Sequence, residues 1–192
     1  MSTQSSKRLA KTATDRQSRK SWLEAALQAL ARGGIDRVRV ESLAKDLGVT
    51  KGSFYWHFKD REQFFDEMLS FWAEQSTQTV ITNVHYPTDP AARVRAVAED
   101  IVRRDLAGMD PHIRSWTQYD PERAEIVAGI DKIRFEFIRG LFLAVGFSKN
   151  SASLRAHSLY RYALGEQFIP VKESMSQRLK RMKAHVNLLL QQ

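Results

Sequence analysis

The sequence predicts an all-α fold of about nine helices. Three observations lead to this prediction. Apolar residues recur three and four positions apart along most of the 192-residue chain, a spacing that places them on one face of a helix. Glycine, proline and aspartate interrupt this pattern where helices are expected to begin or end. No segment alternates convincingly as a half-buried strand does, and we find no internal repeat.

In the first third of the chain, the spacing of apolar residues predicts three helices and the start of a long one. The first runs from Arg16 to the pair Gly33-Gly34, because glycine accepts the left-handed conformation of a helix end. A short helix over residues 43–47 stops at Gly48. The next helix ends near residue 58, and Thr50 is expected to cap it through its side chain.

The remainder predicts longer helices. Asp60 is a candidate cap for a helix over residues 61–83, and the segment HYPTDP at 85–90 then breaks the pattern. Each later boundary carries a glycine, a proline or an Asp-Pro pair. The further helices are expected over residues 91–107, 111–119, 121–145, 150–168 and 172–190.

The charge is concentrated at one end of the chain. The net charge is +8, and residues 1–62 hold 13 Lys or Arg against 7 Asp or Glu, whereas residues 63–192 hold 17 against 15. The N-terminal end therefore offers a field that attracts a polyanion. The alternative is that the basic end only aids solubility.

Several classes of protein do not fit the sequence. There is no apolar run near 18 residues and no secretory signal pattern, so we expect no membrane association. The absence of cysteine fits a cytoplasmic protein. The five histidines show no metal-ligand spacing, and there is no glycine-rich phosphate loop or nucleophile motif. We therefore expect no cofactor, no metal and no enzymatic activity.

Residues 43–59 have the spacing of a helix-turn-helix, in which the second helix enters the major groove of DNA. Lys51 and Ser53 at the start of that helix have side chains that can bond base edges, and Gly52 permits close approach. His57 and Lys59 are candidates for phosphate contacts.

The four aromatic residues of this segment are expected to divide between core and surface. At about 100° per residue, Phe54 and Phe58 share a face with Leu47 and Val49 behind them, whereas Tyr55 and Trp56 point outward. The alternative reading places all four rings in the core and leaves the lysines on a solvated face.

Residues 19–65 strongly resemble the DNA-binding domain of TetR-family bacterial regulators. The resemblance rests on Ala25-Ala26, Gly34, Leu43-Ala44, Leu47-Gly48-Val49, Lys51-Gly52, Tyr55 and His57-Phe58-Lys59. It covers about a quarter of the chain, and the C-terminal part shares few motifs with the family.

The resemblance implies a set of DNA contacts. Lys51, Gly52, Tyr55 and Trp56 would lie against bases or sugar-phosphate, and phosphates would be held by Thr50, Tyr55, His57 and Lys59. Two positions depart from the family. Arg39 replaces a capping Ser or Thr, so either the helix begins less firmly or the arginine contacts a phosphate. Glu41 stands where a positive residue is common, and it would repel the backbone unless it reads a cytosine amino group.

The basic stretch at the N-terminus has a role in this interpretation. Lys7, Arg8, Lys11, Arg16, Arg19 and Lys20 stand against a single acid. We expect this arm to follow the DNA backbone or to reach a minor groove.

The family also holds a small-molecule pocket in its C-terminal domain. The resemblance makes Trp72, Trp116, Tyr119 and Phe137 candidate lining residues for an apolar or amphipathic effector, although aromatic residues at helical spacing are more often core. Arg114 and Arg134 are expected either to form structural ion pairs, for example with Asp131, or to bind an acidic ligand in the cavity.

The last two helices carry apolar stripes that are candidates for a dimer interface. The residues concerned are Leu159, Ala163, Met175, Leu179, Met182 and Val186. Such a stripe can also close the core of a single chain. The family dimerises through its last two long helices, which favours the interface, and two reading heads match a palindromic operator.

The sequence thus predicts a basic arm over residues 1–15, a DNA-binding domain over residues 16–62 and a ligand-binding and dimerisation domain over residues 63–192. The expected function is that of a homodimeric, ligand-responsive transcriptional repressor that binds double-stranded DNA. The first alternative is a non-transcriptional DNA-binding protein of the same fold without an inducer. The second is a helical ligand-binding or enzyme-like protein whose basic end is incidental.

Overall fold

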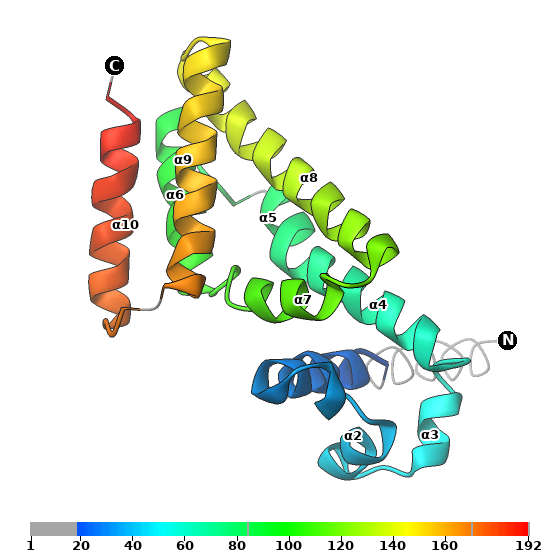
Figure 1. The fold of residues 1–192 in the computed structure, drawn as a ribbon. Helices are drawn as coiled ribbons and strands as arrows, with labels where there is room; N and C mark the ends of the chain where they lie inside the picture. The colour runs from blue at the N-terminus through cyan, green and yellow to red at the C-terminus, as the bar shows by residue number, and fades with distance from the viewer. Residues whose placement is uncertain (1–18, 84, 170, 192) are drawn as a thin grey trace, which may run out of the picture. The chain divides into compact units, whose positions relative to one another are not determined.

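The computed structural model describes residues 19–83, 85–169 and 171–191, and within these ranges every regular element is a helix (Figure 1). The all-α prediction is confirmed. The chain forms two compact units, of which the first ends at Trp72 and the second begins at Ala73. The sequence had suggested a boundary ten residues earlier, but Phe64 packs on rings of the N-terminal unit.

From residue 19 on, the N-terminal unit contains four helices and one short turn of 3₁₀-helix. Residues 19–33 are helical and are followed by η1 (Ile35–Arg37), α2 (Val40–Leu47), α3 (Lys51–Tyr55) and α4 (Arg61–Ala73). Gly34 and Gly48 have φ values of 75° and 68°, a region that suits glycine because it has no Cβ. These two glycines end the first helix and α2, as the sequence predicts.

Aromatic rings that pack mostly edge to face form the centre of this unit. The Phe54 ring lies 5.4 Å from that of Trp22, 5.1 Å from that of Phe58 and 5.1 Å from that of Phe64, measured between centroids. Both Phe54 and Phe58 are about 1% exposed. These contacts tie α3 to the first helix and to α4. Val49 is 41% exposed, so its predicted place behind the two phenylalanines is wrong.

The predicted helix over residues 61–83 is interrupted. After α4 the chain passes through a π-helical segment, η2 (Glu74–Gln78), before the short α5 (Thr79–Ile81). The predicted start is confirmed, because Asp60 Oδ1 accepts a hydrogen bond from the backbone N–H of Gln63 at 2.8 Å. π-Helical turns are rare and occur often at functional sites.

The C-terminal unit continues with five helices. These are α6 (Pro90–Arg103), α7 (Asp110–Thr117), α8 (Pro121–Val145), α9 (Lys149–Phe168) and α10 (Met175–Leu189). Asp89 and Asp120 cap α6 and α8 through their side chains. The last helix begins three residues later than predicted, because Ser174 and Gln177 form a capping box there.

Helices α6, α8, α9 and α10 enclose the core of this unit (Figure 1). Leu159 and Ala163 of α9 and Met182 and Val186 of α10 belong to this core, and each is at most 7% exposed in a single chain. Their predicted role in a dimer interface is therefore wrong. The stripes on α9 and α10 close the core of the single chain, while Met175 remains 44% exposed and Leu179 is half-buried.

Candidate nucleic-acid interface and effector cavity

Helix α3 presents polar and aromatic side chains outward from a buried base. Lys51 and Gly52 are exposed, Tyr55 is 59% exposed and Trp56 is 86% exposed. Ser53 is half-buried. Phe54 and Phe58 hold the segment to the unit. The Tyr55 ring lies edge to face with that of Phe54, 5.2 Å away between centroids, but most of its surface remains exposed. An exposed tryptophan is the kind of residue that contacts a partner.

Thr50 occupies the N-cap position of α3, but its side chain makes no capping hydrogen bond. The predicted capping role is therefore wrong. The helix begins instead with the Thr50 backbone carbonyl, which accepts from the Ser53 N–H at 3.0 Å. Thr50 is exposed, and its hydroxyl is not engaged in capping.

Arg39 occupies the N-cap position of α2 and does not cap it through its side chain. Its Nε donates instead to the Asp36 carbonyl at 2.9 Å, and the residue is exposed. Arg39, which stands where the family commonly has Ser or Thr, thus places a positive charge at the beginning of α2.

An ion pair joins the two helices of the motif. The Lys51 Nζ lies 2.5 Å from Glu41 Oε1, and both side chains are more than half exposed. The hydrogen bond from Lys51 lowers the pKa of Glu41, and the same bond raises the pKa of Lys51. This pair could not be predicted from the sequence, since neither residue type nor spacing links a residue of α2 to one ten positions later.

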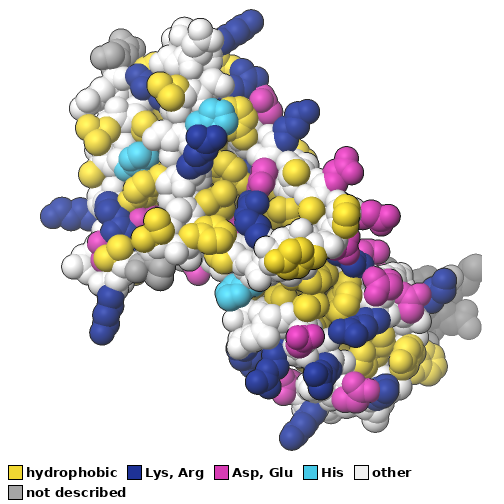
Figure 2. Space-filling model, viewed as in Figure 1, with side chains coloured by type: hydrophobic (Ala, Val, Ile, Leu, Met, Phe, Trp, Pro, Cys, Tyr) yellow, Lys and Arg dark blue, Asp and Glu magenta, His cyan; other side chains and the backbone are white. Residues whose placement is uncertain are grey.

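These groups border a shallow groove of about 490 Å³ on the N-terminal unit. Arg39, Lys51 and Arg61 supply positive charge, and Tyr55 supplies a hydroxyl. Asp36 and Glu41 supply negative charge. Acidic and basic side chains are also interspersed over the face of this unit drawn in Figure 2. The groove is therefore mixed in charge rather than uniformly basic.

The segment after α3 is held by a cation of the first helix. Arg19 Nη1 donates to the His57 carbonyl at 2.6 Å, and its Nε donates to Glu67 Oε2 at 2.8 Å. Its guanidinium also lies 4.8 Å from the centroid of the Phe58 ring. Arg19 thus holds the segment after α3 in place. It is not available to follow the DNA backbone as part of a basic arm. Of the predicted arm, residues 1–15 and Arg16 lie outside the described residues.

The two remaining predicted phosphate ligands differ in exposure. Lys59 is exposed, and its backbone N–H donates to Gln63 Oε1 at 2.8 Å, which orders the turn before α4. His57 is half-buried, with its ring 6.2 Å from that of Phe58.

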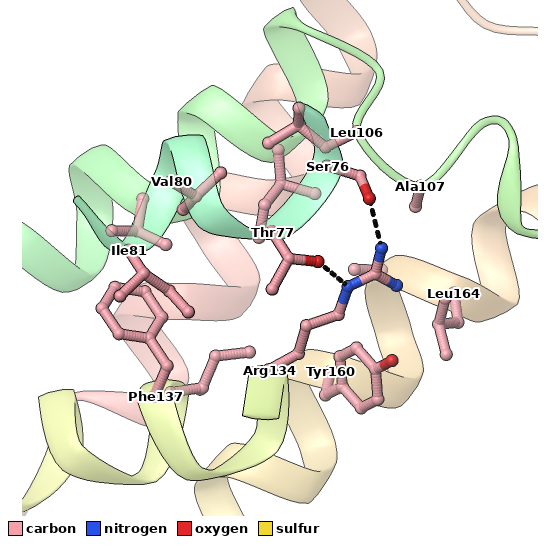
Figure 3. A pocket seen from close by; sticks show the side chains of 14 residues that line it. Ser76, Thr77, Val80, Ile81, Leu106, Ala107, Arg134, Phe137, Tyr160 and Leu164 are labelled. Atoms are coloured by element: carbon pink, nitrogen blue, oxygen red, sulfur yellow. Dashed lines mark hydrogen bonds between the residues drawn. The ribbon is translucent and has the colours of Figure 1, made fainter. Parts of the chain in front are cut away.

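The C-terminal unit contains a small cavity of about 50 Å³. Apolar side chains form most of its wall, and the polar groups gather at one end, as Figure 3 shows. The polar lining residues are Ser76, Thr77, Arg134 and Tyr160; the apolar ones include Val80, Ile81, Val97, Ile101, Leu106, Phe137 and Leu164.

The structure brings only two of the predicted ligand residues to this cavity, Arg134 and Phe137. Trp72 is buried in the N-terminal unit, and Tyr119 is 89% exposed. Trp116 is half-buried, with the Arg123 guanidinium 5.7 Å from its ring centroid. None of these three, nor Arg114, lines the cavity.

Arg134 reaches the cavity from α8 and is 9% exposed. Its Nε donates to Thr77 Oγ1 at 2.7 Å and its Nη2 donates to Ser76 Oγ at 2.6 Å (Figure 3). Its Nη1 donates to Asp110 Oδ1 at 2.7 Å. One guanidinium thus connects the π-helical segment η2 with the first turn of α7.

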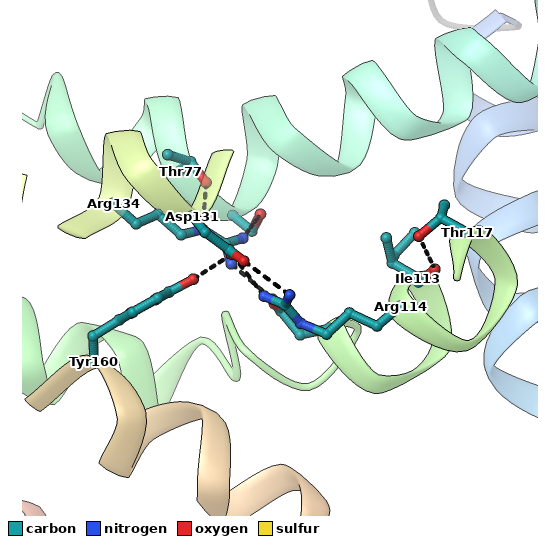
Figure 4. A network of polar contacts seen from close by, with 9 residues as sticks. Thr77, Ile113, Arg114, Thr117, Asp131, Arg134 and Tyr160 are labelled. Atoms are coloured by element: carbon teal, nitrogen blue, oxygen red, sulfur yellow. Dashed lines mark hydrogen bonds and ion pairs between the residues drawn. The ribbon is translucent and has the colours of Figure 1, made fainter. Parts of the chain in front are cut away.

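A second arginine extends this network, which Figure 4 shows. Arg114 donates to Asp131 over distances of 2.6 and 2.9 Å and to Asp110 Oδ1 at 3.2 Å. The Tyr160 hydroxyl donates to Asp131 Oδ1 at 2.6 Å. Both arginines therefore form structural ion pairs. This is one of the two roles predicted for them from the sequence.

Burial and hydrogen bonding set the pKa values in this network. Burial works to raise the pKa of Asp131, but the hydrogen bonds from Arg114 and Tyr160 outweigh it, and the pKa is lowered. Burial, together with the hydrogen bond to Asp131, raises the pKa of Tyr160 to about 12. At neutral pH the network therefore holds a neutral tyrosine and an ionised Asp131.

The described part of the chain contains neither a membrane-spanning helix nor a cluster of metal ligands. No helix there is long and apolar enough to cross a membrane. No group of three or more potential metal ligands occurs among the same residues.

Comparison with known proteins agrees with this architecture. Residues 23–68 match the family model described as "Bacterial regulatory proteins, tetR family". The HTH-type transcriptional regulator AcrR of Shigella flexneri is 28% identical over 82 residues, which cover 42% of this chain and 38% of that protein. A probable acrEF/envCD operon repressor of Escherichia coli (strain K12) is 30% identical over 67 residues, which cover 35% and 29%.

Solved structures extend the likeness to the whole fold. A putative transcriptional regulator from Saccharomonospora viridis, solved in complex with choline, superposes with a TM-score of 0.73 at 19% identity, covering 91% of this chain and 96% of that one. A transcriptional regulator from Rhodococcus sp. Rha1 gives 0.69 at 17% identity, covering 90% and 95%.

Residues 23–68 are thus similar to the DNA-binding part of bacterial regulatory proteins of the tetR family, and the chain shares the fold of solved transcriptional regulators. The aligned sequence stretches span well under half the length of the curated relatives.

Proposed function

We propose that this protein is a homodimeric transcriptional repressor of the cytoplasm that binds a palindromic DNA operator and releases it when a small molecule binds. The observation that carries the proposal is the construction of α3. Lys51, Tyr55 and Trp56 point away from a buried aromatic base, and this helix follows α2 with the spacing of a helix-turn-helix. Nothing in the packing of the unit requires an 86% exposed tryptophan at position 56.

The DNA contacts are assigned by exposure and chemistry. Lys51, Gly52 and Ser53 read base edges at the start of α3. Phosphates are held by Arg39, Thr50, Tyr55, His57 and Lys59, which set the register of the protein on the duplex. Trp56 packs on sugar-phosphate or on a thymine methyl group.

The effector site is the cavity of the C-terminal unit. It is predominantly apolar with a few polar groups at one end, the usual composition of a small-molecule site. Of the lining residues expected from the sequence, Phe137 and Arg134 border this cavity, and Arg134 is at the same time paired with Asp110. Regulation requires that the effector bind one conformation of the protein more tightly than the other.

The dimer forms through the surface shared by α8 and α9, because the apolar stripes on α9 and α10 are already buried in the core of one chain. The Phe135 and His157 rings stack there with centroids 4.1 Å apart. Leu154, one turn before His157, is 71% exposed. Exposed apolar side chains next to a stacked ring pair are suited to an interface between identical subunits.

Genomic footprinting of the protein tests this function. Binding at a small number of sites that overlap promoters supports a repressor. Dispersed binding without promoter bias supports the alternative, a DNA-binding protein of the same fold without an inducer. Absence of binding to any duplex at low salt contradicts both.

A further inference from the structure

The polar end of the cavity carries no net charge. Arg134 is the single charged residue among the described residues that line the cavity. It pairs with Asp110, which is 0% exposed, and Arg114 pairs with both Asp110 and Asp131. Two cations therefore face two anions in one connected network. A ligand at this end meets an arginine whose charge is already balanced.

The rest of the wall offers no partner for a charge. It is built from Val80, Ile81, Val97, Ile101, Phe137 and other apolar side chains. A carboxylate or an ammonium group moved into such a site loses its hydration and gains no counter-ion. A charged ligand would therefore either remain unpaired or break the pairs that Arg134 and Arg114 form. An uncharged ligand faces neither cost.

Arg134 also holds the π-helical segment. Ser76 and Thr77 both lie in η2, and both hydroxyls accept hydrogen bonds from this one guanidinium. These hydroxyls line the same cavity. A hydrogen-bond acceptor that enters the polar end competes with them for the N–H groups of Arg134. Because η2 begins directly after the last residue of α4, a change in η2 acts on the helix that leads back to the DNA-binding unit.

The cavity in this structure is small. Its volume of about 50 Å³ accommodates a few waters but is smaller than the cavities that hold an aromatic ring. Leu106 and Ala107 form part of its wall, and they lie in the non-helical turn between α6 and α7. Asp105 in that turn has a φ of 49°, an unfavourable region for a residue with a Cβ. This turn is the part of the wall that regular helical hydrogen bonds constrain least.

We propose that the effector is an uncharged molecule with an apolar body and one hydrogen-bond acceptor, and that its acceptor takes Arg134 from Ser76 and Thr77 and so loosens η2. The proposal rests on the assignment of the cavity as the effector site. It names the chemical class of the effector and the contact through which binding is sensed.

Three probes of equal chain length test the charge requirement with the full-length protein: 1-hexanol, hexanoate and hexylamine at neutral pH. Binding is measured by isothermal titration calorimetry. We expect 1-hexanol to bind saturably and the two charged probes to bind at least about tenfold more weakly. Equal or tighter binding of hexanoate or hexylamine would overturn the proposal, and so would the absence of saturable binding by 1-hexanol.

Two variants locate the binding. Ala163→Leu narrows the cavity and should abolish binding of 1-hexanol, whereas Ala184→Leu, at an exposed position of α10, should leave it unchanged. If Ala163→Leu does not fold, Leu164→Phe serves the same purpose from the next lining position. Undiminished binding to a folded cavity variant contradicts the assignment.

Hydrogen exchange tests the sensing contact. Binding of 1-hexanol should speed amide exchange in residues 74–81, and the double variant Ser76→Ala, Thr77→Val should show similarly fast exchange without ligand. Unchanged exchange in this segment on saturation with 1-hexanol would refute the role of Arg134. These measurements involve no DNA, so their failure is distinguishable from a failure to bind an operator.

Discussion

Lys51 of α3 and Glu41 of α2 form an ion pair of 2.5 Å on the surface proposed to contact DNA. From the sequence alone, an acid at position 41 is expected to repel the phosphate backbone. The structure gives it a partner, and that partner is the proposed base-reading lysine. The pair reduces the positive charge that α3 offers to any duplex and fixes the direction of the lysine. Glu41 thereby favours sequence discrimination over non-specific attraction.

The first prediction follows from this pair. Glu41→Gln should bind random duplex DNA more tightly than the natural protein, and the slope of log affinity against log salt should steepen by about one. Fluorescence anisotropy titrations at several salt concentrations measure both. Asp46→Asn is the matched control, since Asp46 is an exposed acid of α2 that pairs with Arg32 at 3.4 Å. An equally steepened salt slope for Asp46→Asn would show that removal of any acidic side chain of α2 has this effect.

The second prediction concerns the outward residues. Tyr55→Ala should weaken operator binding by about tenfold, the effect of losing one hydrogen bond to a charged group, and should leave the protein folded. Lys59→Ala should weaken binding to all sequences and reduce the salt slope by about one. Phe54→Ala is expected instead to destabilise the unit by about 3–5 kcal/mol, because Phe54 is 1% exposed. Gel shifts and thermal unfolding of the three variants separate these roles; full operator affinity in Tyr55→Ala would contradict the assignment.

The third prediction concerns the buried arginine. Arg134→Met should lower the free energy of unfolding by about 3–5 kcal/mol, because it leaves Asp110 buried without its closest counter-ion. The double variant Arg134→Met, Asp110→Asn should recover part of this loss. Arg139→Met on the same helix breaks a partly exposed pair with Glu136 and should cost at most about 1 kcal/mol. Urea unfolding of these proteins and of the single variant Asp110→Asn gives the comparison, and additive losses in the double variant would count against the pairing.

The fourth prediction is a pH dependence. The pKa of Tyr160 is about 12 in the folded protein, against about 10 in an unfolded chain. The folded protein therefore keeps this proton through a range in which the unfolded chain releases it. Raising the pH from about 10 to about 12 should then lower the free energy of unfolding. Tyr160→Phe should show a shallower decline over this range in urea titrations. The same decline in both proteins would contradict the contribution of Tyr160.

The fifth prediction concerns the dimer. Leu154→Glu should produce a monomer in sedimentation equilibrium, because it places a charge on the proposed α8–α9 interface. Ile133→Glu is the control: Ile133 is similarly apolar and 48% exposed, but it lies on the side of α8 opposite Phe135. A dimer that persists in Leu154→Glu, or that dissociates in Ile133→Glu, would place the interface elsewhere.

The sequence predicted the elements well, because their signals are local. Gly34, Gly48 and Asp60 mark helix ends by their own conformational preferences, and the structure places them there. The division of the aromatic cluster was also predictable, since Phe54 and Phe58 lie four residues apart and Tyr55 does not share their face.

The long-range contacts around the effector cavity and the packing of α10 could not be predicted from local sequence patterns. Arg134 bonds side chains 57 and 58 positions earlier in the chain, and no local pattern reports such a contact. Both contacts are made to the π-helical segment. The stripe on α10 was visible, but a stripe does not state whether its partner belongs to the same chain. Burial of Met182 and Val186 in one protomer decided that question.

Selection of binding sequences from a pool of random duplex DNA tests the central claim most directly. Our account predicts that the protein enriches a single palindromic site, in which the two half-sites are spaced for a dimer, and that the variant Lys51→Ala loses information at one position in each half-site. Enrichment of no sequence, or of a site without two-fold symmetry that Lys51→Ala selects equally well, would contradict it.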